Sequence, residues 1–243
     1  MKTKIVPMVP TSAPIAEPTI LQAEPEPLEI DRQRTAIVLI DLQNALISNG
    51  GMIDLIGKYD VAERQKIITP IKEVTSMARA RGCRIVYTVD RSSLDLHDCG
   101  GASSPNWYKS IALVSYREHP EWQDKLLFRN TWGAEIIEEL KPQEGDIVIE
   151  KQRLSAFFGT NLDIILKGYN IKYLLFGGVT TNICVEAGLR DAYYRDYFPI
   201  LISDAAVHSG PPFMQEATIF NLKYHYGWVT NAKNVIKAMA EAE

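Results

Sequence analysis

Short apolar runs alternate along this chain with longer segments whose apolar residues recur every three or four positions. The short runs have the length and composition of strands buried on both faces, and the periodic segments are typical of helices that pack one face on a sheet. Expected strands cover residues 35–41, 83–89, 146–151, 172–176, 198–202 and 228–229, and expected helices cover residues 61–81, 132–140, 161–168, 182–197, 212–226 and the segment from residue 231 onward.

This alternation predicts the fold class. Strands that alternate with helices form a mostly parallel sheet with helices on both faces and right-handed crossovers. We therefore expect an α/β protein with three α/β/α layers, built on a doubly wound sheet of about six strands. No internal repeat is visible in the sequence.

The first thirty residues do not follow the pattern. They are rich in proline and glutamate and have neither helical nor strand periodicity. Such a segment buries too little apolar surface to offset the entropy lost on ordering. We expect residues 1–30 to form a disordered or loosely docked arm, with packing across a neighbouring subunit as the alternative, and residues 31–243 to form the folded domain.

Composition narrows the function classes. The 243 residues are 46% hydrophobic and 23% charged, with a net charge of −4 and a pI near 5.7, which gives no electrostatic case for binding nucleic acid or an anionic membrane. No apolar run approaches the roughly 20 residues that cross a bilayer, and the N-terminus lacks the pattern of a secretory signal. Three cysteines cannot all pair, so a cytoplasmic location is the expectation.

Residues 174–186 contain the most informative motif. An apolar strand pattern meets Gly177 and Gly178, and Cys184 then opens a helical pattern. The start of a helix carries unpaired N–H donors and partial positive charge, which would lower the pKa of a thiol and could hold the oxyanion of a carbonyl under attack. A buried, inert helix cysteine is an equally good interpretation of this segment alone.

Two further reactive side chains stand at the ends of expected strands. Asp41 ends the first strand and Lys151 ends the third. In parallel sheets, binding sites lie beyond the carboxyl ends of the strands. A carboxylate near Cys184 could take the thiol proton and return it to a leaving amine, and a lysine could stabilise both anions. Taken one at a time, the aspartate could simply cap a turn and the lysine could be solvated; the four histidines are interpreted as surface or structural residues.

These residues and their flanks, Ile40 to Asn44 and Gly178 to Cys184, resemble those of the isochorismatase-like cysteine hydrolases, from about Thr35 to the C-terminus. The resemblance implies that Asp41 is the general acid and base, that Lys151 organises the thiolate and that Cys184 forms a thioester. It also implies a cis peptide bond between Val179 and Thr180, with the N–H groups of Thr180 and Cys184 as the oxyanion hole.

Within that family the chain is most similar to the ureidoacrylate amidohydrolases. The similarity is carried by residues 100–106, 155–158, 182–186 and 226–229. The loop 90–98 departs from the pattern: Asp90 and Ser92 stand where those enzymes have an amide and an aromatic residue, and Asp98 replaces a glutamate. The resemblance implies a hydrolase for a small ureido or carbamoyl compound, with ureidoacrylate, biuret and triuret as candidates.

The remaining site residues are expected to contact substrate or to brace the site. Gln43 and Asn44 follow the aspartate, and bracing is the favoured role for both. The other candidates for substrate contact are Asp90, Asn106, Tyr108 and Phe157. No metal or other cofactor is expected, because His97 with its aspartates is explained by a short polar loop. The resemblance also implies a homo-oligomer, for which the aromatic-rich segment 213–226 could provide an interface.

Other functions remain open from the sequence. The chain could be another amidase of the same family, such as an N-carbamoyl amino acid amidase or a nicotinamidase. The latter usually has an aspartate and histidine metal site that has no counterpart here. Isochorismate-type hydrolases commonly lack the cysteine that this chain keeps. A non-catalytic binding module would not need all three of Asp41, Lys151 and Cys184.

Overall fold

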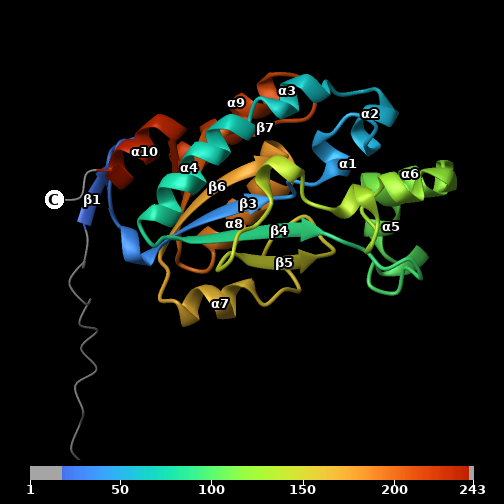
Figure 1. The fold of residues 1–243 in the computed structure, drawn as a ribbon, viewed down its shortest axis with the longest axis horizontal. Helices are drawn as coiled ribbons and strands as arrows, with labels where there is room; N and C mark the ends of the chain where they lie inside the picture. Colours follow the sequence, from blue (N-terminus) through green and yellow to red (C-terminus); the bar gives the residue numbers. More distant parts are fainter. Residues whose placement is uncertain (1–17, 241–243) are drawn as a thin grey trace, which may run out of the picture.

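The computed structural model describes residues 18–240 (Figure 1). Its centre is a six-stranded parallel sheet in the order β5-β4-β3-β6-β7-β8. The strands are β3 (Thr35–Ile40), β4 (Arg84–Asp90), β5 (Ile147–Lys151), β6 (Tyr173–Val179), β7 (Phe198–Val207) and β8 (Trp228–Thr230). The predicted six-stranded, mostly parallel sheet is confirmed.

Helices cover both faces of this sheet, and others lie beyond the ends of its strands (Figure 1). They are α1 (Asn44–Ile47), α2 (Met52–Ile56), α3 (Val61–Gln65), α4 (Ile68–Ala80), α5 (Pro105–Lys109), α6 (Ile111–Glu118), α7 (Leu162–Gly168), α8 (Glu186–Tyr193), α9 (Phe213–Asn221) and α10 (Ala232–Ala240). Helices α4 and α10 lie on one face, and α7 and α8 on the other (Figure 1). No helix among residues 18–240 is both long and apolar enough to span a bilayer.

Strand β3 shows how the sequence produces the three layers. All six of its residues are buried. Because side chains alternate across a strand, Ile37 and Leu39 enter the core under α4 and α10, while Ala36, Val38 and Ile40 enter the core against α7 and α8. A continuous apolar run is therefore required here, since neither face of the strand meets water.

The strand order also contains a reversal. From β3 the chain moves outward through β4 to β5, then returns to pair β6 with the other side of β3 and continues through β7 to β8. Doubly wound sheets bind ligands at this switch point, beyond the carboxyl ends of the strands. The reversal places the ends of β3 and β6 side by side.

Two predicted helices differ from the structure. The expected helix over residues 61–81 is divided into α3 and α4 near Lys66. Pro70 lies in the first turn of α4 and has no N–H to donate to the carbonyl of Lys66, so the two helices do not fuse. The expected helix over residues 132–140 is instead two 3₁₀ turns, Trp132–Ala134 and Glu138–Leu140, because Ile136 between them pairs with Gln43 as an isolated β-bridge.

The described part of the expected arm is also ordered. Strands β1 (Pro18–Leu21) and β2 (Leu28–Asp31) form an antiparallel hairpin. Leu21 and Ile30 are fully buried in the core of the same chain, and the Thr19 hydroxyl donates to the carbonyl of Ala238 in α10. Residues 18–30 are thus packed on the domain. The buried side chains of Leu21 and Ile30 hold them there, although the surrounding sequence has no periodicity. The rest of the arm lies outside the described residues.

Candidate active site

Four neighbouring strands each bring one functional group to the same edge of the sheet. The register pairs Asp90 at the end of β4 with Lys151 at the end of β5, and Ile40 at the end of β3 with Gly178 in β6. Asp41 follows β3 directly, and Thr180 follows β6. Aspartate, lysine and the cysteine turn after β6 are thus brought together by the sheet register.

Asp41 and Lys151 form a buried ion pair. The Lys151 Nζ lies 2.8 Å from Asp41 Oδ2, and both side chains are almost fully buried. The ammonium also donates to the carbonyl of Arg153 at 3.2 Å and lies 3.9 Å from Asp90 Oδ2. The second oxygen of Asp41, Oδ1, is buried without a well-formed hydrogen bond among the described residues. A carboxylate held this way keeps a free lone pair for a proton.

The charges of this pair are mutually dependent. Burial alone would lower the pKa of Lys151, but its interactions with Asp41, Cys184 and Asp90 outweigh burial and raise that pKa, so the amine stays protonated. Burial raises the pKa of Asp41, while the Lys151 charge and hydrogen bonds from Lys151 and the Cys184 thiol oppose the rise. Asp41 is therefore an aspartate whose affinity for a proton exceeds the ordinary value, as an acid and base in catalysis requires.

Cys184 lies in a π-helical turn, Thr181–Val185, that leads into α8. The residue is half-buried and lines a cavity, and its thiol interacts with Asp41. Contrary to the sequence expectation, the pKa of the Cys184 thiol is raised: burial is the largest cause, Asp41 and Asp90 add to it, and Lys151 opposes it. Burial and the two nearby carboxylates thus favour the neutral thiol in the resting enzyme.

Close backbone packing fixes the position of Asp41. A side chain at Gly178 could not be accommodated, because its Cβ would lie 2.1 Å from the carbonyl oxygen of Ile40, and Gly178 has a φ of +113°. Asp41 itself has a φ of 52°, which is uncommon outside glycine. Its N–H donates to the carbonyl of Thr88 at 2.9 Å. The peptide bond between Val179 and Thr180 is cis, the conformation implied by the resemblance.

A cavity of about 170 Å³ opens above these groups. Asp41, Asp90, Thr180 and Cys184 line it, and apolar side chains form much of its remaining wall. Burial raises the pKa of Asp90 to about 6, with Asp41 adding to the rise and Lys151 opposing it. The cavity has room for a small molecule only, and it presents both carboxylates and the thiol to that molecule.

Of the six candidate substrate contacts, only Asp90 lines this cavity. Gln43 is buried and braces β4, since its amide exchanges 2.9 Å hydrogen bonds with the backbone N–H and carbonyl of Asp90. Asn44 donates to the carbonyl of Trp132. The other three lie elsewhere: Asn106 donates to the carbonyl of Cys99, the Tyr108 hydroxyl donates to that of Ala102, and Phe157 packs in the core.

Sequence reasoning missed several residues of the cavity wall, of which Arg64 is the most unusual. It is 2% exposed, lies in α3 and reaches the hydroxyl of Ser209, a residue that follows β7. A signal was available, because Arg64 lies three residues after the buried Val61 and therefore on the same buried face of α3. Ser209, by contrast, comes from a loop far along the chain and gives no local signal.

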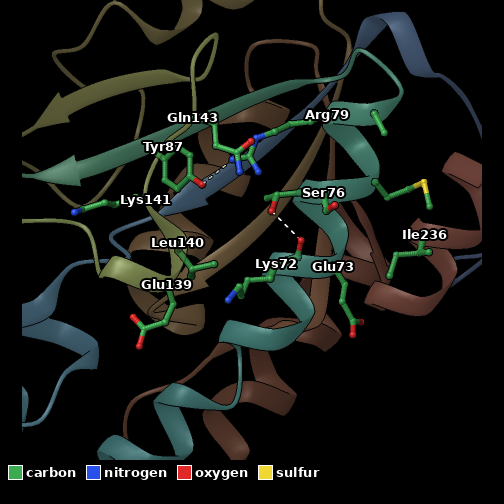
Figure 2. A pocket seen from close by; sticks show the side chains of 13 residues that line it. Lys72, Glu73, Ser76, Arg79, Tyr87, Glu139, Leu140, Lys141, Gln143 and Ile236 are labelled. Carbon is green, nitrogen blue, oxygen red and sulfur yellow. Dashed lines mark hydrogen bonds between the residues drawn. The ribbon is translucent and has the colours of Figure 1, made fainter.

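A second, larger hollow does not contain this chemistry. A groove of about 790 Å³ runs along α4, and Figure 2 shows Arg79, Tyr87 and Gln143 around it. None of the predicted site residues lines it. Within residues 18–240, no group of three His, Cys, Asp or Glu side chains is placed to hold a metal ion. The strand-end cavity is therefore the candidate active site.

Comparison with known proteins agrees with this fold. Residues 35–234 match the model of the Isochorismatase domain. The chain belongs to the isochorismatase family.

Among curated proteins, it is 41% identical to the ureidoacrylate amidohydrolase RutB of Agrobacterium fabrum over 222 residues, which are 91% of this chain and 97% of that protein. It is 40% identical to the RutB of Serratia proteamaculans over 235 residues, covering 96% and 94% of the two chains.

Solved structures with the same fold include hydrolases. A cysteine hydrolase from Pseudomonas syringae pv. phaseolicola superposes with a TM-score of 0.72 at 25% identity, covering 88% of this chain and 96% of that chain. The N-carbamoylsarcosine amidase of Thermoplasma acidophilum superposes with a TM-score of 0.60 at 27% identity, covering 82% and 96%.

Proposed function

We propose that this protein is a cysteine-dependent amidohydrolase that cleaves a C–N bond of a small ureido or carbamoyl compound. The observation that carries the proposal is the buried pair of Asp41 and Lys151, 2.8 Å apart, which faces the thiol of Cys184 at the base of a small cavity. The similarity to ureidoacrylate amidohydrolases over most of both chains supports this substrate class.

The first step joins deprotonation to attack. Because the pKa of the Cys184 thiol is raised, the thiolate does not accumulate before substrate binds. Asp41 takes the thiol proton as the sulfur bonds to the substrate carbonyl carbon, and the carbonyl π electrons move to oxygen. The N–H groups of Thr180 and Cys184 are the proposed donors to that oxyanion, and one such donor contributes roughly 3–4 kcal/mol to transition-state stabilisation.

The second step expels the amine. The oxyanion reforms its double bond, the C–N bond breaks, and protonated Asp41 gives its proton to the departing nitrogen. Burial raises the pKa of Asp41, which suits it to hold this proton until the nitrogen needs it. An acyl or carbamoyl thioester remains on Cys184. Asp41 then activates a water molecule that attacks the thioester and restores the thiol, with ammonia or carbamate among the products.

Lys151 acts on charge in both steps. It stays protonated beside Asp41, so it keeps that carboxylate ionised in the resting enzyme and stabilises negative charge that develops on sulfur. Asp90 is the one sequence-predicted substrate contact in the cavity, and its carboxylate suits the N–H donors of a ureido group.

A specific observation favours one alternative. The structural similarity to an N-carbamoylsarcosine amidase fits an N-carbamoyl amino acid as substrate, which the same mechanism would cleave. We further propose a homo-oligomer, to which the exposed aromatic residues Phe213, Phe220 and Tyr224 could contribute an interface, and a cytoplasmic location.

Turnover of a substrate panel tests the proposal. Ammonia release is measured with ureidoacrylate, biuret, triuret and N-carbamoyl amino acids, using the wild type, Cys184→Ala and Cys83→Ala. Cys83 is buried within hydrogen-bonding distance of the Arg32 carbonyl and lines no part of the cavity. We expect activity in the wild type and Cys83→Ala and none in Cys184→Ala. No turnover of any compound by the wild type would refute the proposed function.

A further inference from the structure

Arg64 is a buried cation without a counterion. Its side chain is almost fully enclosed, yet no Asp or Glu carboxylate among the described residues lies within ion-pair distance of it. Its neighbours are neutral: one guanidinium nitrogen donates to the Ser209 hydroxyl, another makes a long 3.4 Å bond to the carbonyl of Leu46, and Tyr59 lies 5.4 Å away under the guanidinium.

The guanidinium is also incompletely hydrogen-bonded. The Nε atom of Arg64 is buried with no hydrogen-bond partner in the described structure. Burying a charge without a partner is costly, and buried charges in proteins are ordinarily paired. Arg64 lines the same cavity as Cys184, so a ligand in that cavity can supply the missing anion.

Contacts through Ser209 tie Arg64 to the nucleophile turn. The side-chain amide of Asn182 donates to the carbonyl of Ser209 at 3.1 Å and accepts from its N–H at 3.0 Å. Ser209 in turn accepts from Arg64. Asn182 lies two residues before Cys184, so the cation is held in a fixed relation to the attacking sulfur.

Sheet order gives the direction of the ligand. Asp90 ends β4 and Ser209 follows β7, while Asp41 follows β3 and Cys184 lies in the turn after β6, the two strands between them. The cavity therefore has an acidic end at Asp90, the reactive groups in the middle and a cationic end at Arg64. Together with Lys151, which pairs with Asp41, the charged groups that line the cavity are three cations (Arg64, Lys109 and Lys151) and two carboxylates.

We propose that Arg64 is a specificity-determining residue that binds a carboxylate of the substrate, whose ureido or carbamoyl group lies at Cys184 and Asp90. The proposal rests on the proposed function and deepens it. A planar guanidinium matches a carboxylate with two parallel hydrogen bonds, which a neutral urea such as biuret cannot offer. The substrate class is then the ureido acids, compounds with a carbamoylated nitrogen at one end and a carboxylate at the other.

The test compares acids with their neutral amides. Values of kcat/KM are measured for ureidoacrylate and 3-ureidopropionate and for the corresponding carboxamides, with the wild type, Arg64→Met and Arg64→Lys. We expect Arg64→Met to lower kcat/KM for the acids by roughly 10- to 100-fold, the range for a hydrogen bond between charged groups. Its kcat/KM for the carboxamides should change less than about threefold. Arg64→Lys keeps the charge without the fork and should recover part of the loss.

Arg79→Met is the matched control. It removes a guanidinium that pairs with Asp146 and lines the groove of Figure 2, outside the active site, and it should leave the preference for acids unchanged. A structural role for Arg64 predicts a different pattern, in which Arg64→Met has an equally reduced kcat/KM for acids and amides and unfolds at a lower temperature. Either that pattern or an unchanged preference in Arg64→Met overturns the proposal.

Binding separates this inference from the proposed function. Calorimetric titration of the Cys184→Ala variant with each acid and its carboxamide measures recognition without turnover. If Cys184→Ala binds the acid more tightly than the amide, and the added Arg64→Met substitution removes this preference, the carboxylate site is supported. Absence of hydrolysis by the wild type would then refute only the proposed function. Equal binding of acid and amide by Cys184→Ala, with hydrolysis by the wild type, overturns the carboxylate site alone.

Discussion

Replacing Lys151 by methionine tests the energetics of the buried ion pair. The Lys151 ammonium lies 2.8 Å from Asp41 and both side chains are almost fully buried. Two unit charges at this distance attract by about 6 kcal/mol at an effective dielectric constant of about 20. Desolvation of both groups offsets much of that attraction, but removing one partner leaves the other buried and unpaired, which costs about 3–5 kcal/mol. We expect Lys151→Met to lose stability in that range.

The pH dependence of the loss has a defined sign. Lys151 opposes the rise in the pKa of Asp41, so that pKa climbs further in Lys151→Met. The stability cost of the unpaired Asp41 carboxylate is then fully present above this folded-state pKa. It is lost progressively as the pH falls from there toward the ordinary pKa of aspartate. The stability difference between Lys151→Met and the wild type should therefore shrink between pH 7 and pH 4, because protonated Asp41 no longer needs a partner.

Urea unfolding followed by circular dichroism, at one fixed protein concentration, measures this loss. The double variant Asp41→Asn with Lys151→Met removes both charges and should lose less than the sum of the single variants. Lys66→Met is the matched control, because Lys66 pairs with Glu63 on the surface, with 67% and 56% of the two side chains exposed, and such pairs contribute about 0–1 kcal/mol. A Lys151→Met protein as stable as the wild type at pH 7 would refute the reasoning.

Two further predictions concern the position of Asp41 and the charge state of the thiol. Gly178→Ala should reduce turnover at least tenfold and lower stability by about 1–3 kcal/mol, because the new Cβ meets the backbone of Ile40. Gly159→Ala is the control, because Gly159 also has a positive φ but lies in open space, and this variant should keep its activity. Equal activities of the two variants would count against the packing argument. Asp90→Asn should speed alkylation of Cys184 by iodoacetamide at pH 8 several-fold, since the Asp90 charge raises the pKa of that thiol; a slower reaction would contradict the electrostatic assignment.

The local pattern was sufficient to predict the sheet and the groups at its edge. A strand buried on both faces must be apolar throughout, so a charged residue such as Asp41 marks its end. The parallel register then decides which strand ends are neighbours. Both rules depend only on short stretches of sequence and on the general topology of parallel sheets. They were therefore enough to predict that Asp41, Lys151 and Cys184 lie close together.

The cavity wall could not be predicted in the same way. The helical spacing indicates that Arg64 is buried, but its partner Ser209 is 145 positions away, and a single sequence does not show that the two residues meet. The position of Gln43 after the proposed catalytic aspartate favours a bracing role, and its side chain forms hydrogen bonds with the backbone of Asp90. The helix start predicts a lowered pKa for the Cys184 thiol, but burial and two carboxylates at the ends of other strands raise it.

Gly133 shows why one predicted helix is absent. A Cβ at this glycine would lie 2.3 Å from the carbonyl oxygen of Leu126, so the segment packs directly on another stretch of backbone. Three residues further on, Ile136 forms an isolated β-bridge with Gln43. Tertiary contacts of this kind override a weak helical pattern.

The most direct test of the central claim is to trap the covalent intermediate. Enzyme mixed briefly with ureidoacrylate is quenched in acid, digested and mapped by mass spectrometry, with Asp41→Asn as a variant that cannot accept the thiol proton. The mechanism predicts a substrate-derived acyl or carbamoyl group on the peptide with Cys184, none on Cys83 or Cys99, and no adduct in Asp41→Asn. Full turnover by Cys184→Ala, or an adduct at another residue, would contradict it.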